Sequence, residues 1–395
     1  MQQQESVTER QRRLRTAQRV VIKLGTSVVT GASGEISWER IEPLVRSIAA
    51  LKTAGRQVVL VSSGAVGLGA GRLGLHTSRL RDVVVRQACA AVGQSLLMHA
   101  YEKFFRVDDV KIAQVLLTED DFTEWSRYTN LRRTMEKLLK LGVLPIVNEN
   151  DTVSSAELEY VGAGQERVFG DNDRLAALVM SRLESDALVL LTDVEGLLLQ
   201  NPKDDQVSGK DERPVLITLV EEITEELKAV AAGPSAGGRG GMSTKLEAAQ
   251  IAMQAGGVAV IANGMKPGVL DDIFAGKEIG TTFMSTSRMA GKRRWITYAA
   301  GVRGRVIVNE GARAAIMGGK ASLLSSGVLR VEQQFEPQDV VSIADCEGHE
   351  FARGIINCAS REAVALIAGT AATHPEGERA RVLVTRDNMV LSEQR

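Results

Sequence analysis

The segment with the most suggestive chemistry is GGMSTK, residues 240–245, within the run GPSAGGRGGMSTKLEAAQ. Glycines, hydroxyl groups and a lysine at the start of a predicted helix are residue types that bind phosphate. Their order differs from a Walker A loop, in which Gly-Lys precedes Ser or Thr. We expect Ser243 to cap the helix and Lys245 to point at the anion that the helix dipole attracts. A capped helix with a surface lysine is the alternative that this segment alone leaves open.

Two further clusters of polar residues follow apolar runs. Lys23 interrupts the run VVIKLG, and a buried lysine is costly unless it meets an anion. Gly25 leaves room for a ligand to approach the backbone. Ser62-Ser63-Gly64 ends another run and opens a glycine-rich turn whose N–H groups could hold a carboxylate or phosphate. A strand-end lysine that reaches water, and ordinary turn chemistry, are the structural alternatives.

Acidic and amide side chains gather in NEND (148–151) and GDND (170–173). Single turns of this kind are usually structural. Two of them around one loop, beside a buried sheet, could bind a substrate ammonium group, Mg²⁺ or both. In TDVEG (192–196), Thr192 and Asp193 could contact a nucleotide or cap the next segment.

These segments need a scaffold that brings them to one edge. Short Val/Ile/Leu runs alternate with helical patterns, the clearest at 38–54, 83–105, 129–141 and 243–255. Continuous apolar strands are buried on both faces, which predicts a mostly parallel sheet covered by helices. Ligands bind beyond the carboxyl ends of such strands, so the polar clusters should form one site. We interpret 154–169 and 203–240 as surface loops or lids.

Beyond about residue 300 the pattern changes to short β-rich pieces separated by Gly, Asp and Pro, which predicts a small, mostly-β domain.

The 395 residues suffice for two or three domains, and the net charge of −1 favours neither nucleic acid nor an anionic membrane. No apolar run approaches the roughly 20 residues that cross a bilayer. Three cysteines in no metal-ligand spacing indicate reduced thiols and a cytoplasmic location.

The first 19 residues carry five arginines and no apolar core, so they are not a secretory signal. We expect a frayed cytosolic extension. An Arg-rich transit peptide is the other interpretation, against which Glu5 and Glu9 count.

As a set, the segments VIKLGTSV, LVSSGAVGLG, AAVGQ, PIVNENDTV, GDND, LLTDVEGL, GGMSTKLEAA and NGMKPG resemble the amino acid kinase family, and within it the glutamate 5-kinase subfamily. The resemblance runs from about Val20 to Arg395, because the terminal β domain resembles a PUA domain. It implies an α/β fold, an αβα sandwich with a mostly parallel central sheet, plus the small mostly-β domain. We therefore divide the chain into an extension without a family counterpart (1–18), a kinase domain (19–292), a PUA-like domain (300–379) and a C-terminal segment (380–395).

The resemblance implies ATP-dependent phosphorylation of the γ-carboxylate of L-glutamate to L-glutamyl 5-phosphate, the first step of proline biosynthesis. Lys23 and Lys245 would neutralise the transferred phosphoryl group and Asp173 would hold both lysines. Glutamate would be bound by Ser63, Asn148, Asp151, Asp171 and Asn172. ATP would be bound by Lys23, Thr192, Asp193, Arg239, Gly240, Gly241, Met242, Ser243, Thr244 and Lys245. Mg²⁺ would be held mainly by the ATP phosphates, with no direct protein ligand.

The residues are consistent with this chemistry. A carboxylate nucleophile has a reference pKa of about 4.3 and needs no general base at neutral pH. All four histidines lie outside the motifs. The transfer needs charge neutralisation and in-line placement, which lysines, Mg²⁺ and backbone N–H groups supply. Asp151 suits the substrate ammonium group, and the Ser63-Gly64 turn suits its α-carboxylate.

Two departures from the family pattern concern the site. Arg239 replaces a small hydroxyl residue and could reach a phosphate or fold into solvent. Residues 159–168 lengthen the loop between the two Asx-rich segments, where glutamate and the feedback inhibitor proline would bind. The family also implies a homo-oligomer, and a labile product suggests hand-over to glutamate 5-semialdehyde dehydrogenase.

Two alternatives remain open. A sister kinase acting on acetylglutamate or aspartate is disfavoured by the NEND and GDND pair and by the PUA-like tail. A non-catalytic nucleotide- or RNA-binding regulator is disfavoured because both Lys23 and Lys245 are present. Residues 301–369 contain seven basic and eight acidic residues. This segment therefore lacks the excess of positive charge that is typical of RNA binding.

Overall fold

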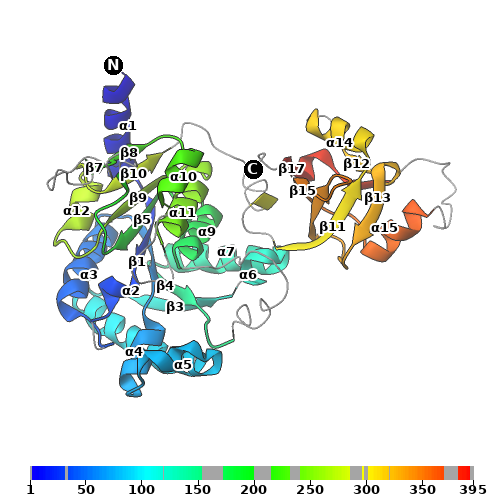
Figure 1. The fold of residues 1–395 in the computed structure, drawn as a ribbon. Coiled ribbons are helices and arrows are strands. Elements are labelled where there is room, and N and C mark those ends of the chain that lie inside the picture. Colours follow the sequence, from blue (N-terminus) through cyan, green and yellow to red (C-terminus); the bar gives the residue numbers. More distant parts are fainter. Residues whose placement is uncertain are drawn as a thin grey trace, which may run out of the picture. The chain divides into compact units, whose positions relative to one another are not determined.

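The computed structural model describes residues 2–31, 34–118, 120–153, 172–199, 215–231, 241–284, 296–297, 301–319, 321–368 and 381–391. The chain divides into two compact units (Figure 1). The first contains residues 1–119 and 130–288, and the second contains 120–129 and 289–395. The sequence did not indicate that 120–129 would join the second unit. The predicted domain boundaries remain predictions.

The main sheet of the first unit has the strand order β3-β4-β2-β1-β5-β9-β10-β8. All neighbouring strands are parallel except β9 and β10, so the predicted mostly parallel sheet is confirmed. The strands are β1 (Arg19–Leu24), β2 (Gln57–Ser62), β3 (Ile112–Leu117), β4 (Leu144–Glu149), β5 (Ala187–Thr192), β8 (Leu219–Val220), β9 (Val258–Asn263) and β10 (Thr281–Met284).

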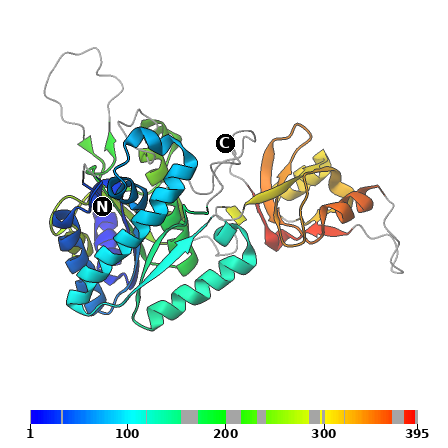
Figure 2. The ribbon, with the colours of Figure 1, turned by 90° about the horizontal axis from the view of Figure 1, so that it is seen from below.

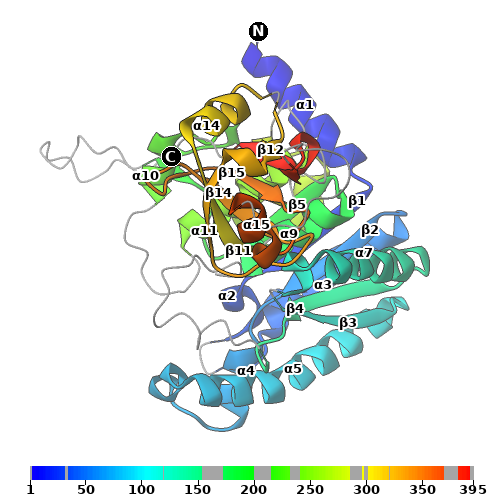
Figure 3. The ribbon, with the colours of Figure 1, turned by 90° about the vertical axis from the view of Figure 1, so that its right-hand side faces the viewer.

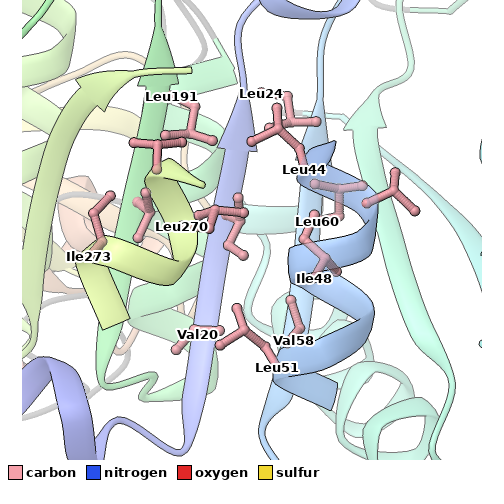
Figure 4. Close-up of a cluster of buried hydrophobic side chains, with 14 of the residues drawn as sticks. Val20, Leu24, Leu44, Ile48, Leu51, Val58, Leu60, Leu191, Leu270 and Ile273 are labelled. Atoms are coloured by element: carbon pink, nitrogen blue, oxygen red, sulfur yellow. The ribbon is translucent and has the colours of Figure 1, made fainter. Parts of the chain in front are cut away.

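Helices cover both faces of this sheet. On one face, α3 (Trp38–Thr53) and α12 (Val269–Phe274) pack side chains such as Ile48 and Leu270 against β1, β2 and β5 (Figure 4). Ile22 and Leu24 of β1 belong to this cluster. Because side chains alternate along a strand, Lys23 points to the opposite face. That face is covered by α9 (Asn172–Leu183) and α11 (Met242–Gln254), which lie side by side in Figures 1 and 3.

The remaining elements of the first unit largely follow the predicted helical patterns. The 83–105 prediction is confirmed by α5 (Val83–Phe105), whereas the helix predicted at 129–141 begins earlier, as α7 (Trp125–Lys140). The loop prediction for 203–240 is wrong for 215–231, which form two short strands and a helix. The rest of that loop, and all of 159–168, lie outside the described residues. The other elements are α2 (Thr26–Val29), α4 (Ala65–Arg72), β6 (Leu198–Leu199), β7 (Val215–Leu216) and α10 (Glu225–Ala231).

The N-terminal segment is not frayed, which corrects the sequence-based expectation. It forms α1 (Gln2–Thr16), whose Leu14 is buried in the core of the first unit. Arg10 is 2% exposed and pairs with Glu278 at 3.3 Å, and Arg15 Nε donates to the carbonyl oxygen of Ala275 at 2.7 Å. The helix is therefore an integral part of this unit. Across the described residues, no helix is long and apolar enough to span a membrane.

The second unit has its own five-stranded sheet in the order β13-β11-β14-β15-β17, coloured yellow to red in Figure 2. Phe335, Ile343 and Leu383 lie in its separate apolar core. The predicted small, mostly-β domain is confirmed. Its elements are α6 (Asp120–Thr123), β11 (Val302–Val308), α14 (Glu310–Met317), β12 (Leu323–Leu324), β13 (Val328–Glu332), β14 (Val340–Ala344), β15 (Glu350–Ile355), α15 (Ser360–Ile367), β16 (Val382–Val384) and β17 (Met389–Leu391).

Candidate active site at the carboxyl edge of the main sheet

Two lysines and one aspartate form a buried ionic cluster. Lys23 Nζ lies 2.7 Å from Asp173 Oδ1, and Lys245 Nζ lies 3.0 Å from Asp173 Oδ2. Lys23 and Lys245 are 4% and 6% exposed, and Asp173 is fully buried. The three residues come from β1, α11 and α9, far apart in the sequence. One carboxylate thus holds two ammonium groups at a single buried position.

The local sequence explains why these side chains meet. Lys23 faces α9 and α11 because of the strand alternation in β1. Asp173 occupies the first turn of α9, where the helix dipole favours an acid. Lys245 is in the first turn of α11. That helix begins at Met242 with Gly241 as its N-cap and no side-chain cap, so the prediction that Ser243 is the cap is wrong. Gly241 has an extended backbone, which starts the helix before Ser243 is reached.

Electrostatics keep Asp173 ionised despite its burial. Burial alone would raise the pKa of this carboxyl group. The charges of Lys23 and Lys245, and the hydrogen bonds that they donate, outweigh burial and hold the pKa below its usual value. Asp173 is therefore an anion at neutral pH and holds two cations side by side.

A second polar cluster lies at the ends of β2 and β4. Asn172 Nδ2 lies 2.9 Å from Ser63 Oγ and 3.0 Å from Asn148 Oδ1. Asn148 Nδ2 donates to Gln94 Oε1 at 3.0 Å. Gln94, on α5, was not among the predicted site residues. Its segment AAVGQ was noticed only as part of the family pattern, because a single glutamine in an apolar helix has no chemical signature of its own.

A buried hydrogen bond holds the end of β2, directly before the turn. Tyr101 Oη lies 2.7 Å from Ser62 Oγ, and both side chains are buried. Burial raises the pKa of Tyr101, and the hydrogen bond with Ser62 opposes that shift only in part. Gly64 has a φ of 103°, in the left-handed region that favours glycine, and precedes α4. Ser63 is thereby held at the edge of the sheet.

A cavity of about 310 Å³ opens beside this cluster. Asp151 lines it together with Gln94, and so do Glu149, Asn150 and Thr152 of the same turn. Asp171, Arg239 and Gly240, which were also predicted to bind substrate or nucleotide, lie outside the described residues.

The predicted nucleotide residues lie at the carboxyl end of β5, where Thr192 is the last residue of the strand and Asp193 comes directly after it. Thr192 Oγ1 donates to Asp193 Oδ1 at 3.0 Å, while the Gly25 N–H donates to the carbonyl oxygen of Leu191 at 2.9 Å. Beyond the predicted residues, Glu195 accepts from Lys266 at 2.5 Å and from Asn263 at 3.1 Å. These bonds lower the pKa of Glu195, with the Lys266 bond contributing most. They tie together the turns that follow β5 and β9.

Comparisons with known proteins agree with this architecture. The amino acid kinase family model matches residues 18–263, and the PUA domain model matches 304–374. The chain therefore belongs to the amino acid kinase family.

Within this family, the chain is similar over most of its length to curated glutamate 5-kinases. A glutamate 5-kinase of Moorella thermoacetica is 46% identical, with 89% of this chain and 90% of that protein covered. A glutamate 5-kinase of Myxococcus xanthus is also 46% identical, over 87% of each chain. A glutamate 5-kinase of Geobacter sulfurreducens is 39% identical over 96% of this chain and 98% of its own.

Proposed function

We propose that this protein transfers the γ-phosphoryl group of ATP to the side-chain carboxylate of L-glutamate, giving L-glutamyl 5-phosphate and ADP at the start of proline biosynthesis. The observation that carries this proposal is the buried Lys23–Asp173–Lys245 cluster in a chain whose curated relatives are glutamate 5-kinases over most of its length. The cluster suits phosphoryl transfer because it offers fixed positive charge and no nucleophile of its own.

The proposed roles follow from the chemistry of each group. Lys23 and Lys245 stabilise the negative charge on the phosphoryl oxygens as the carboxylate oxygen of glutamate attacks phosphorus. Asp173 keeps both ammonium groups oriented and is not itself a proton acceptor, because its pKa is low. Ser63 and Asn172 contact the amino acid, and Asp151 accepts from its ammonium group. Thr192, Asp193 and the loop that ends at Lys245 bind ATP.

Magnesium fits this scheme as a partner of the nucleotide. Among the described residues, no group of three His, Cys, Asp or Glu side chains could hold a metal ion. Asp173 already pairs with two lysines. We therefore assign Mg²⁺ to the ATP phosphates, where it would neutralise charge.

Regulation and partners remain proposals drawn from the family resemblance. They comprise feedback inhibition by proline, assembly into a homo-oligomer, hand-over of the acyl phosphate to glutamate 5-semialdehyde dehydrogenase, and a cytoplasmic location. A kinase for acetylglutamate or aspartate is not favoured, since the relatives that match most of the chain are glutamate 5-kinases.

The experiment is an ATP- and Mg²⁺-dependent hydroxamate assay, in which hydroxylamine traps any acyl phosphate. Glutamate, aspartate and N-acetylglutamate are compared, each with and without proline. Glutamate-selective hydroxamate supports the proposal. Product with another acid in preference to glutamate would contradict the substrate, and no product from folded, ATP-binding protein would contradict the activity.

A further inference from the structure

A chain of hydrogen-bonded side chains leads from the β2 turn to the cavity. It begins at Ser63, passes through Asn172 and Asn148, and ends at Gln94. Asn172 Nδ2 also lies 3.3 Å from the carbonyl oxygen of Ser62.

The contact with the Ser62 carbonyl fixes the direction of every amide in the chain. A carbonyl oxygen can only accept, so the group of Asn172 that faces it must be the NH₂ group. Asn148 must then present its oxygen to Asn172 and its NH₂ group to Gln94. Gln94 must in turn present its oxygen to Asn148. Its own NH₂ group, Nε2, is therefore directed away from the chain.

Nε2 of Gln94 is a donor that still needs an acceptor. Gln94 is 9% exposed, and Nε2 is buried with no hydrogen-bond partner among the described residues. A buried donor of this kind costs free energy unless a ligand or a water satisfies it. Gln94 is also one of the residues that line the cavity, whose volume is large enough for a small molecule.

The backbone of α5 holds Gln94 at a fixed position. The preceding residue, Gly93, packs directly on α4, where a Cβ would collide with the carbonyl oxygen of Ala65. Two helices in such close contact fix the position of the α5 backbone next to Gln94. With its oxygen bonded to Asn148, the amide of Gln94 is preorganised to donate in one direction.

We propose that Gln94 is a specificity residue whose Nε2 donates to the α-carboxylate of the amino-acid substrate. This inference rests on the proposed function. The ammonium group and the α-carboxylate of an amino acid share one carbon, so their acceptor and donor must lie in the same cavity. Asp151 and Gln94 both line it. Neither Lys23 nor Lys245 is among its described lining residues, so the reacting carboxylate extends beyond it toward the lysines.

The test is Gln94→Glu, which keeps an oxygen for Asn148 but replaces the donor with a negative charge. We expect the KM for glutamate to rise roughly tenfold or more, since a charge-assisted hydrogen bond is lost. We expect the KM for ATP and kcat to stay within about twofold, because the lysine cluster is untouched. Gln87→Glu makes the same chemical change two turns earlier on α5, at a residue that is not among those lining the cavity, and should leave all three constants unchanged.

Two further measurements separate binding from packing. Lowering the pH from about 8 to about 5.5 should lower the glutamate KM of Gln94→Glu, whereas the wild-type KM stays flat. The introduced carboxyl group would be buried, which raises its pKa, and its protonated form regains a donor. If Gln94→Glu does not fold, Gln94→Met removes the donor without adding charge and should raise the same KM. An unchanged KM for glutamate would overturn the inference. A fall in kcat accompanied by equal rises in the KM for glutamate and the KM for ATP would overturn it too. Absence of glutamyl hydroxamate from the wild type would instead count against the proposed function.

Discussion

Replacing Asp173 by asparagine should destabilise the first unit, because it removes the carboxylate that pairs with both lysines of the buried cluster. In the wild type, Asp173 Oδ1 and Oδ2 each meet a different lysine, at 2.7 and 3.0 Å. The neutral amide of the Asp173→Asn variant would leave two buried ammonium groups side by side without the carboxylate that pairs with both. Removing one partner of a buried ion pair costs about 3–5 kcal/mol. With a urea dependence of about 3 kcal/mol per molar, the unfolding midpoint should fall by about 1 M or more.

The pH dependence of this difference follows from the lowered pKa of Asp173. A carboxyl group with a depressed folded-state pKa contributes stability above its unfolded pKa of about 3.9, and loses it as pH falls through the folded value. The gap between wild type and Asp173→Asn should therefore be constant from about pH 5 to 8 and close only in stronger acid.

The assay is urea unfolding in phosphate-free buffer. Hydrogen exchange in β5 is the readout, so that the unfolding of the first unit is measured separately from that of the second. Asp193→Asn makes the same change at an exposed position on the same sheet edge and should shift stability by no more than about 0.5 kcal/mol. Equal midpoints for wild type and Asp173→Asn at neutral pH would refute the electrostatic reasoning.

Three other predictions concern single residues. Lys245→Ala should lower kcat by about a hundredfold or more with little effect on the glutamate KM, because its charge matters most in the transition state. Steady-state hydroxamate kinetics will measure this, and an unchanged kcat would remove Lys245 from the chemistry. Asp151→Ala should raise the glutamate KM about tenfold and spare the ATP KM, and a constant glutamate KM would place the ammonium group elsewhere. Leu14→Asp should destabilise the first unit by about 2 kcal/mol or more in urea unfolding, because it buries a charge under α1. An unchanged midpoint would mean that α1 does not pack there in solution.

The main sheet was predictable because its strands are apolar along their whole length, as parallel strands buried on both faces must be. Polar residues at the strand ends then indicated the edge at which a site forms. No single segment of the sequence predicts that Lys23, Asp173 and Lys245 lie next to one another. Their proximity depends on the alternation of β1 and on the packing of α9 beside α11, and only the family resemblance suggested it.

The failures share a physical cause, which is that tertiary contacts override local pattern. The segment 215–231 looks like a loop, yet β8 is a strand because it pairs with β10. The N-terminal segment looks like a charged tail, but Leu14 is buried in the core of the first unit. Gln94 is inconspicuous in sequence because its importance lies in a hydrogen bond to Asn148, 54 positions away.

The most direct test of the central claim is to follow an oxygen atom. Glutamate labelled with heavy oxygen in its side-chain carboxylate is incubated with ATP, Mg²⁺ and hydroxylamine, and the inorganic phosphate released is analysed by mass spectrometry. If the carboxylate attacks phosphorus, hydroxylamine cleaves the acyl–oxygen bond and each phosphate leaves with one labelled oxygen, matched by one glutamyl hydroxamate. Unlabelled phosphate would mean that glutamate only stimulates hydrolysis of ATP, and the account would be wrong.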